Sequence, residues 1–90
     1  MKTNTIKESI VYESEGYLGT IRLSSRQLRE NGVGSEWGMY DANASSNADV
    51  GWKTVVKLVY KDEHGVALLE RTEYETGEEP DSKLTWVELR

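Results

Sequence analysis

The segment from Asp41 to Asp49 carries an oxygen-bearing side chain at every second position, a spacing that could hold a cation. Calcium loops of the EF-hand type place their oxygen ligands in this way. Two positions break the match, because Ser46 stands where the sharp turn needs glycine and Trp52 stands where a bidentate glutamate belongs. The flanking residues also have strand rather than helix character. We therefore expect an exposed polar loop and no metal site.

Groups able to catalyse a reaction are sparse. The single histidine, His64, lies in a predicted turn beside two carboxylates, with no nucleophile near it in the sequence. The chain has no cysteine, which excludes disulfides, thiol catalysis and thiolate zinc sites. No serine occurs in a nucleophile-elbow context and no glycine-rich phosphate loop follows a strand. The sequence therefore predicts a protein that is not an enzyme and has no cofactor.

The aromatic residues are three Trp and five Tyr, with no Phe. Trp and Tyr carry a polar group on a large apolar ring, and they favour interfaces where one end stays hydrated. Trp37 and Tyr40, next to the polar loop, are interpreted as an aromatic contact patch for a protein or for a stacked ligand such as a sugar. The alternative is that two of the Trp side chains fill the core. A net charge of −5 argues against direct nucleic-acid binding, which needs a basic groove.

The acidic side chains are unevenly placed. Residues 1–60 hold seven acidic and seven basic residues, whereas residues 61–90 hold nine acidic and four basic ones. The densest cluster comprises Glu73, Glu75, Glu78, Glu79 and Asp81. We interpret this cluster as a binding surface for a basic protein partner or as a mimic of a phosphate backbone. The alternative is a solvated hairpin tip that keeps the protein in solution.

Two strands and a short helix are predicted in the first third of the chain. Apolar side chains alternate with polar ones up to Tyr12 and again from Tyr17 to Leu23, and the turn signal Glu15-Gly16 joins the two runs as a hairpin. Ser24 and Gln27 then form a capping box, and the pair of leucines around them forms a hydrophobic staple. These signals predict a helix over residues 25–31, which Asn31-Gly32 ends in a left-handed conformation.

A meander of strands is predicted for the rest. Residues 37–40 read as a short strand, and residues 52–61 form the strongest strand signal. The turn 62–65 leads into a returning strand over 66–74, which places Lys57 opposite Glu70, Leu58 beside Leu69 and Val59 beside Leu68. A second turn at 77–82 precedes a final strand over 84–89. This order of strands would bring Arg71 near Glu88.

The hairpin over residues 52–75 is apolar on both faces near its turn. One face should meet the helix and the core, and the other also needs a cover. The chain termini or a second subunit would supply that cover. In a homodimer of this kind, Val55, Val59 and Leu68 would lie at the centre of the interface.

Ninety residues fit one domain, spanning 1–90. The expected fold is α+β, an antiparallel sheet of five or six strands arranged as a β-meander with one short helix, or a small open barrel. No apolar run reaches the length of a signal peptide or a membrane span. We therefore expect a cytoplasmic protein with no membrane partner.

Our leading hypothesis is a small acidic binding protein whose partner is another, basic protein. Chains of this size, charge and simplicity are typical of accessory and inhibitor proteins of phages and plasmids, and no motif assigns this chain to a family. One alternative is a homodimeric structural module. Another is a small-ligand or carbohydrate binder that uses Trp37 and Tyr40.

Overall fold

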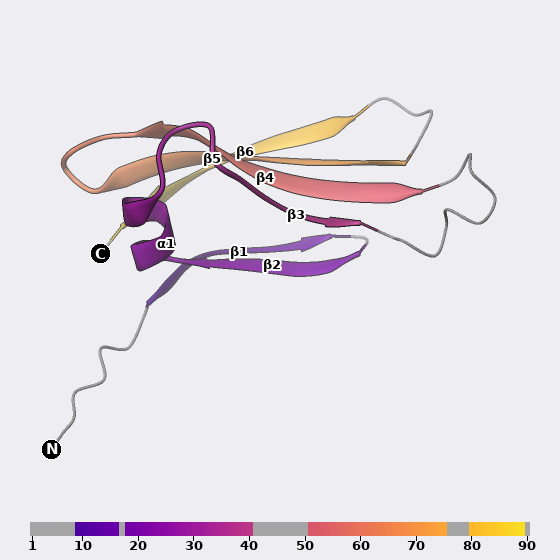
Figure 1. The fold of residues 1–90 in the computed structure, drawn as a ribbon, viewed down its shortest axis with the longest axis horizontal. Helices are drawn as coiled ribbons and strands as arrows, with labels where there is room; N and C mark the ends of the chain where they lie inside the picture. Colours follow the sequence, from indigo (N-terminus) through magenta and orange to yellow (C-terminus); the bar gives the residue numbers. More distant parts are fainter. Residues whose placement is uncertain (1–8, 17, 41–50, 76–79, 90) are drawn as a thin grey trace, which may run out of the picture.

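A computed structural model describes residues 9–16, 18–40, 51–75 and 80–89. Its elements, in chain order, are β1 (Ile10–Gly16), β2 (Gly19–Ser24), α1 (Ser25–Glu30), β3 (Glu36–Tyr40), β4 (Trp52–Lys61), β5 (Val66–Glu75) and β6 (Asp81–Glu88) (Figure 1). The predicted loop at 41–49 and residues 77–79 of the predicted turn at 77–82 lie outside the described residues, while the last two residues of that turn belong to β6.

The strands form two antiparallel sheets. One sheet is the β1–β2 hairpin, and the other has the order β3-β4-β5-β6. The prediction of a mostly antiparallel β structure with one short helix is confirmed. The expectation of a single sheet of five or six strands is corrected, because the hairpin pairs only with itself. The described strands do not close into a barrel.

Helix α1 begins as its sequence predicts. The Ser24 hydroxyl accepts a hydrogen bond from the Gln27 amide at 3.1 Å, and the Gln27 side chain accepts one from the Ser24 amide at 2.8 Å. Leu23 and Leu28, the predicted staple, are both buried. The capping box therefore fixes the start of the helix from local interactions alone.

The end of the helix differs from the prediction. The helix ends at Glu30, and Asn31 is extended with φ −101° rather than left-handed. The positive φ occurs later, at Gly34 (+100°). The Gly34 amide then donates to the Leu58 carbonyl at 2.8 Å, so the chain turns where it must rejoin the large sheet.

The turn between β4 and β5 forms as expected. One oxygen of the Asp62 carboxylate accepts hydrogen bonds from the amides of His64 and Val66, both at 2.9 Å. Gly65 has a φ of +96°, which favours glycine. These local bonds hold β4 and β5 in a hairpin.

The predicted register of that hairpin is confirmed for two pairs and is wrong by one residue nearer the turn. Lys57 lies opposite Glu70 and Leu58 opposite Leu69, as expected. The pairing then shifts between Leu58 and Tyr60, so Tyr60 rather than Val59 lies opposite Leu68. A bulge adds one unpaired residue to a strand, and this one changes which side chain of β4 meets Leu68.

Strand β6 pairs with β5 over its whole length without a shift. Its register places Lys83 opposite Arg71 and Glu88 opposite Val66. The predicted proximity of Arg71 and Glu88 is therefore wrong. The predicted final strand began at residue 84, whereas β6 begins at Asp81. The residue opposite Arg71 is therefore Lys83, which precedes the predicted strand.

The hairpin and helix α1 cover one face of the large sheet, which we call the inner face (Figure 1). The core between the layers contains Tyr12, Ile21, Leu23, Leu28, Val56, Leu58, Ala67, Leu69, Val87 and Leu89. Arg29 fastens the helix to the end of β6, donating to the Leu89 carbonyl at 2.7 Å. The expectation that one face of the β4–β5 hairpin meets the helix and the core is confirmed. Within the described residues, no helix is long and apolar enough to cross a membrane.

Candidate binding face

The opposite side of the large sheet, the outer face, has no layer of described residues over it (Figure 1). Side chains alternate between the two faces of a strand, so the cross-strand register arranges the outer face in rows. From one end to the other, the successive rows are Tyr40–Lys53, Gly38–Val55–Thr72–Ser82, Glu36–Lys57–Glu70–Leu84 and Tyr60–Leu68–Trp86.

One end of the outer face is apolar. Tyr60, Leu68 and Trp86 lie side by side across β4, β5 and β6, and Leu84 is the next outward residue on β6. We call these four residues the apolar patch. Trp86 is 61% exposed, Leu84 58% and Tyr60 45%. The Tyr60 and Trp86 rings meet edge to face, with their centroids 5.8 Å apart and their planes at 71°. This geometry is a favourable one for aromatic pairs.

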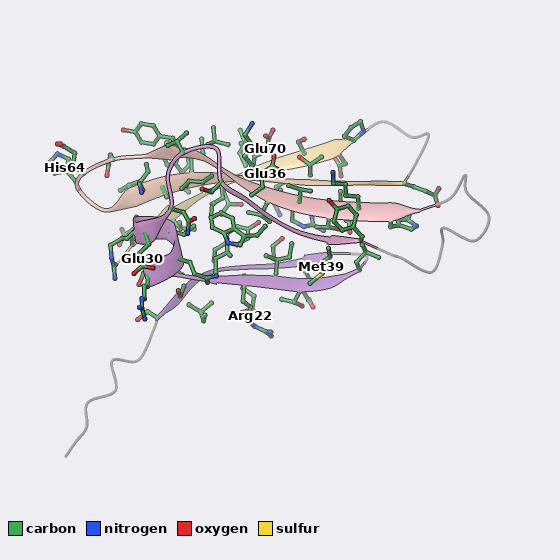
Figure 2. The ribbon with its side chains drawn as sticks, in the orientation of Figure 1. Arg22, Glu30, Glu36, Met39, His64 and Glu70 are labelled. Atoms are coloured by element: carbon green, nitrogen blue, oxygen red, sulfur yellow. The ribbon has the colours of Figure 1, made fainter. Side chains whose placement is uncertain are left out.

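The row beside the patch is charged. Glu36, Lys57 and Glu70 lie next to one another on three adjacent strands. Figure 2 shows Glu36 and Glu70 on the side of the large sheet away from Met39 and the hairpin. These three side chains, with Lys53, Val55 and Thr72, line an open depression of about 270 Å³. Gly38 lies in the same row as Val55 and Thr72. Glycine is favoured at this position because a Cβ atom there would lie 2.8 Å from the Thr54 carbonyl oxygen.

Trp37 and Tyr40 do not form one surface. The Trp37 side chain is half-buried and packs against the core, on the inner face. Tyr40 is 70% exposed on the outer face, where the Lys53 ammonium lies 5.3 Å from the centroid of its ring. The two are three positions apart in the strand, an odd number, so alternation sends their side chains to opposite faces.

The predicted acidic surface is only partly present as a set. Asp81 is exposed and Glu75 is half-buried, while Glu78 and Glu79 lie outside the described residues. Glu73 points to the inner face, where its carboxylate pairs with Arg71 at 2.7 Å and its side chain is 19% exposed. Glu73 therefore does not belong to an outward-facing group of acids.

Arg71 and Glu73 form a polar contact beneath the tip of the β1–β2 hairpin. Glu73 also accepts a hydrogen bond from the buried Thr54 hydroxyl at 3.2 Å. A Cβ atom at Gly16 would lie 2.1 Å from the Arg71 guanidinium and 2.7 Å from the Glu73 carboxylate. The hairpin tip therefore covers this pair closely and shields it from water.

The described residues show no arrangement typical of a reaction centre. His64 lies exposed at the tip of the β4–β5 turn (Figure 2). Among these residues, no three of His, Asp and Glu lie close enough together to hold a metal ion.

The residues predicted at a dimer interface lie at three separate places. Val55 is half-buried beside the depression, and Leu68 is half-buried within the apolar patch. Val59 is the extra residue at the bulge and is 37% exposed. Lys57 and Glu70 stand between Val55 and Leu68, so the three residues do not form a continuous apolar surface.

Sequence reasoning did not single out Tyr60, Leu84 and Trp86 as a site. Leu84 and Trp86 are two residues apart, which does place them on one face of a strand. Their contact with Tyr60 depends on the bulge in β4 and on the register of β6, and neither feature has a signature in the sequence.

Searches among protein families, curated proteins and solved structures find no match to the chain.

Proposed function

We propose that the chain is a small, non-enzymatic protein-binding module that docks another protein through the outer face of its large sheet. The observation that carries this proposal is the exposed edge-to-face pair of Tyr60 and Trp86, with Leu68 and Leu84 beside it. Trp and Tyr are the residues most often found at energetic hot spots of protein interfaces. A docking module without catalytic groups acts by occupying its partner's surface, as accessory and inhibitor proteins do.

The shape of the outer face supports a protein partner over a small molecule. Small-molecule sites enclose most of their ligand in a concave, largely apolar cavity. The depression on this face is instead open and lined by four charged side chains, and the apolar patch is exposed on the surface of a sheet. An open surface of this kind suits another protein.

The charge around the patch supports a basic partner. Two of the four basic residues in the last third are engaged within the chain: Arg71 with Glu73, and Lys61 with the helix. Arg22 and Arg26 pair with Glu13 and Glu30, within the first third. Residues 61–90 nevertheless hold nine acidic and four basic residues, and Glu70, opposite Lys57, lies next to the patch itself; this excess favours a partner that carries positive charge.

Face-to-face stacking of two copies is less favourable. It would bury the row of Glu36, Lys57 and Glu70 in the middle of the interface. The cores of protein interfaces are depleted in charged residues, because each buried charge must be desolvated. A partner that covers the apolar patch and leaves this row at the rim avoids that cost.

The proposal is tested by immobilising the native chain, the Trp86→Ala variant and the Ile10→Ala control in turn, and passing cell lysate over each. Ile10 is also about half exposed, at 51%, but it lies at the start of β1, in the hairpin sheet on the other side of the large sheet. We expect a protein held by the native chain and the control at low salt, lost with Trp86→Ala, and weakened at high salt. Retention of the same proteins by all three chains would contradict the proposal.

A further inference from the structure

Strand β6 is an edge strand with unusual features for an exposed edge. It is the last strand of the large sheet, is eight residues long, and pairs with β5 without a bulge. Proteins protect such edges with short strands, bulges, prolines or charges, because an unpaired edge is a template for another strand. Here Pro80 lies just before the strand, and the charged residues of the strand, Asp81, Lys83 and Glu88, flank a central stretch from Leu84 to Val87 that carries no charge.

The backbone groups that face away from the sheet can be identified. The Leu89 amide donates to the carbonyl of Gly65, its opposite residue, at 2.8 Å. Bonding direction alternates along an antiparallel ladder, so the odd-numbered residues of β6 bond to β5. The amides and carbonyls of Ser82, Leu84 and Trp86 therefore point outward. No backbone hydrogen bond among the described residues uses these outward groups.

The same two residues offer apolar side chains at this edge. Leu84 and Trp86 are both more than half exposed, and one residue, Thr85, separates them. If a second β6 strand lay antiparallel beside the first with a two-fold axis at Thr85, Leu84 would lie opposite the partner's Trp86. Trp86 would lie opposite the partner's Leu84. Both contacts would be hydrogen-bonded pairs, because the backbone groups of both residues point outward.

The alternative symmetric registers fit less well. Centring the axis on Leu84 would place Trp86 opposite the partner's Ser82. Centring it on Trp86 would place Leu84 opposite the partner's Glu88. Only the register centred on Thr85 pairs both exposed apolar side chains with each other. It also places Lys83 opposite the partner's Val87, so no like charges face one another directly.

We propose that two copies of this chain associate through their β6 edges in the register centred on Thr85, forming one continuous eight-stranded antiparallel sheet. Leu84 and Trp86 of both copies form an apolar cluster at the two-fold axis. This interface is isologous and closes, so it gives a dimer rather than a fibre. The two outer faces join into one surface with a patch in its middle. The dimer does not depend on the proposed function, since it would form whether or not another protein docks.

The first test is sedimentation equilibrium of the full chain from micromolar to millimolar concentration. Trp86→Pro removes an outward amide without removing a bond to β5, and proline is tolerated at sheet edges. The matched control is Tyr40→Pro on β3, the other edge. There the Leu58 amide bonds to the Ser35 carbonyl, so alternation points the Tyr40 amide outward too.

We expect the native chain and Tyr40→Pro to form dimers. Trp86→Pro should weaken dimerisation by roughly tenfold or more, because it removes two symmetry-related hydrogen bonds. A native chain that stays monomeric throughout the range would overturn the proposal. A dimer equally stable in Trp86→Pro would overturn it as well.

The second test remains valid even if a proline variant fails to fold. In the proposed register, Thr85 of one copy lies directly opposite Thr85 of the other copy. The two form a non-hydrogen-bonded pair, in which the Cα atoms are about 4.5 Å apart. A disulfide can join two cysteines at this distance. The chain has no cysteine, so Thr85→Cys provides a single thiol per copy. Mild oxidation should crosslink Thr85→Cys into a dimer but leave Lys83→Cys mostly monomeric. Equal crosslinking of the two variants, or none in Thr85→Cys, would exclude this register.

Discussion

The ammonium group of Lys61, at the end of β4, donates a hydrogen bond to the carbonyl oxygen of Arg29 at 3.1 Å. The same group also bonds to the carbonyls of Leu28, at 3.3 Å, and Asn31. The last carbonyls of a helix lack partners within the helix and carry the negative end of its dipole. A residue more than 30 positions away in the sequence therefore caps the C-terminus of α1.

Replacing Lys61 with methionine should destabilise the protein. The methionine keeps the apolar stem and removes the charge, so the helix carbonyls lose their cap. We expect the free energy of unfolding to fall by roughly 1–2 kcal/mol in urea titration. Lys57→Met is the control, because Lys57 is exposed on the outer face of the same strand and should change stability little. Equal losses for both variants would contradict the capping role.

Removing the N-terminal cap should have a comparable effect. Ser24→Ala deletes the acceptor of the Gln27 amide and should cost about 1 kcal/mol. Gln27→Ala deletes the reciprocal bond from the Ser24 amide to the Gln27 side chain. It should cost less, because the Ser24 hydroxyl still caps the helix. Thermal unfolding of both variants beside Ser82→Ala, an exposed serine in β6, measures the difference.

The glycine at the hairpin tip should be sensitive to a single methyl group. Gly16→Ala would push against the Arg71 guanidinium and the Glu73 carboxylate, so we expect a loss of roughly 1–2 kcal/mol. Gly32→Ala is the matched control, since nothing lies within 4 Å of its Cβ position. Its stability should stay unchanged or rise slightly. Urea titration of the two variants distinguishes these outcomes, and a tolerated Gly16→Ala would show that the layers are not closely packed there.

The two arginine–glutamate pairs on different sheets should differ in strength. Arg71 and Glu73 are 13% and 19% exposed, whereas Arg22 and Glu13 are 59% and 53% exposed. A double-mutant cycle on Arg71 and Glu73 should give a coupling energy above about 1 kcal/mol. The exposed pair should give only a few tenths, because water screens it. Similar coupling in both cycles would show that the hairpin tip does not shield the inner pair.

Two leucines on opposite faces of the large sheet should separate core from surface. Leu58→Ala empties a fully buried site between the layers and should cost about 3 kcal/mol or more. Leu84→Ala, at a site 58% exposed, should cost well under 1 kcal/mol in the monomer. Unfolding of both variants at a concentration too low for dimerisation checks this expectation. A large loss for Leu84→Ala would show that something already covers the outer face.

The sequence alone determined the features that depend on near neighbours in the chain. The start of α1 follows from Ser24 and Gln27, and the β4–β5 turn follows from Asp62 and Gly65, because both rest on hydrogen bonds within four residues. The opposition of Lys57 and Glu70 needs the bulge in β4 as well as the turn, because the bulge shifts the register between the turn and this pair.

Only the tertiary structure decided how these pieces pack. The bulge at Val59 brings Tyr60 opposite Leu68, and the long-range register of β6 brings Trp86 next to both. Packing of the hairpin on the large sheet turns Glu73 inward to Arg71. A shift of one residue reverses the face on which a strand side chain lies, and the alternatives differ only in contacts between residues distant in sequence. The identity of the exposed patch was therefore settled by packing rather than by local pattern.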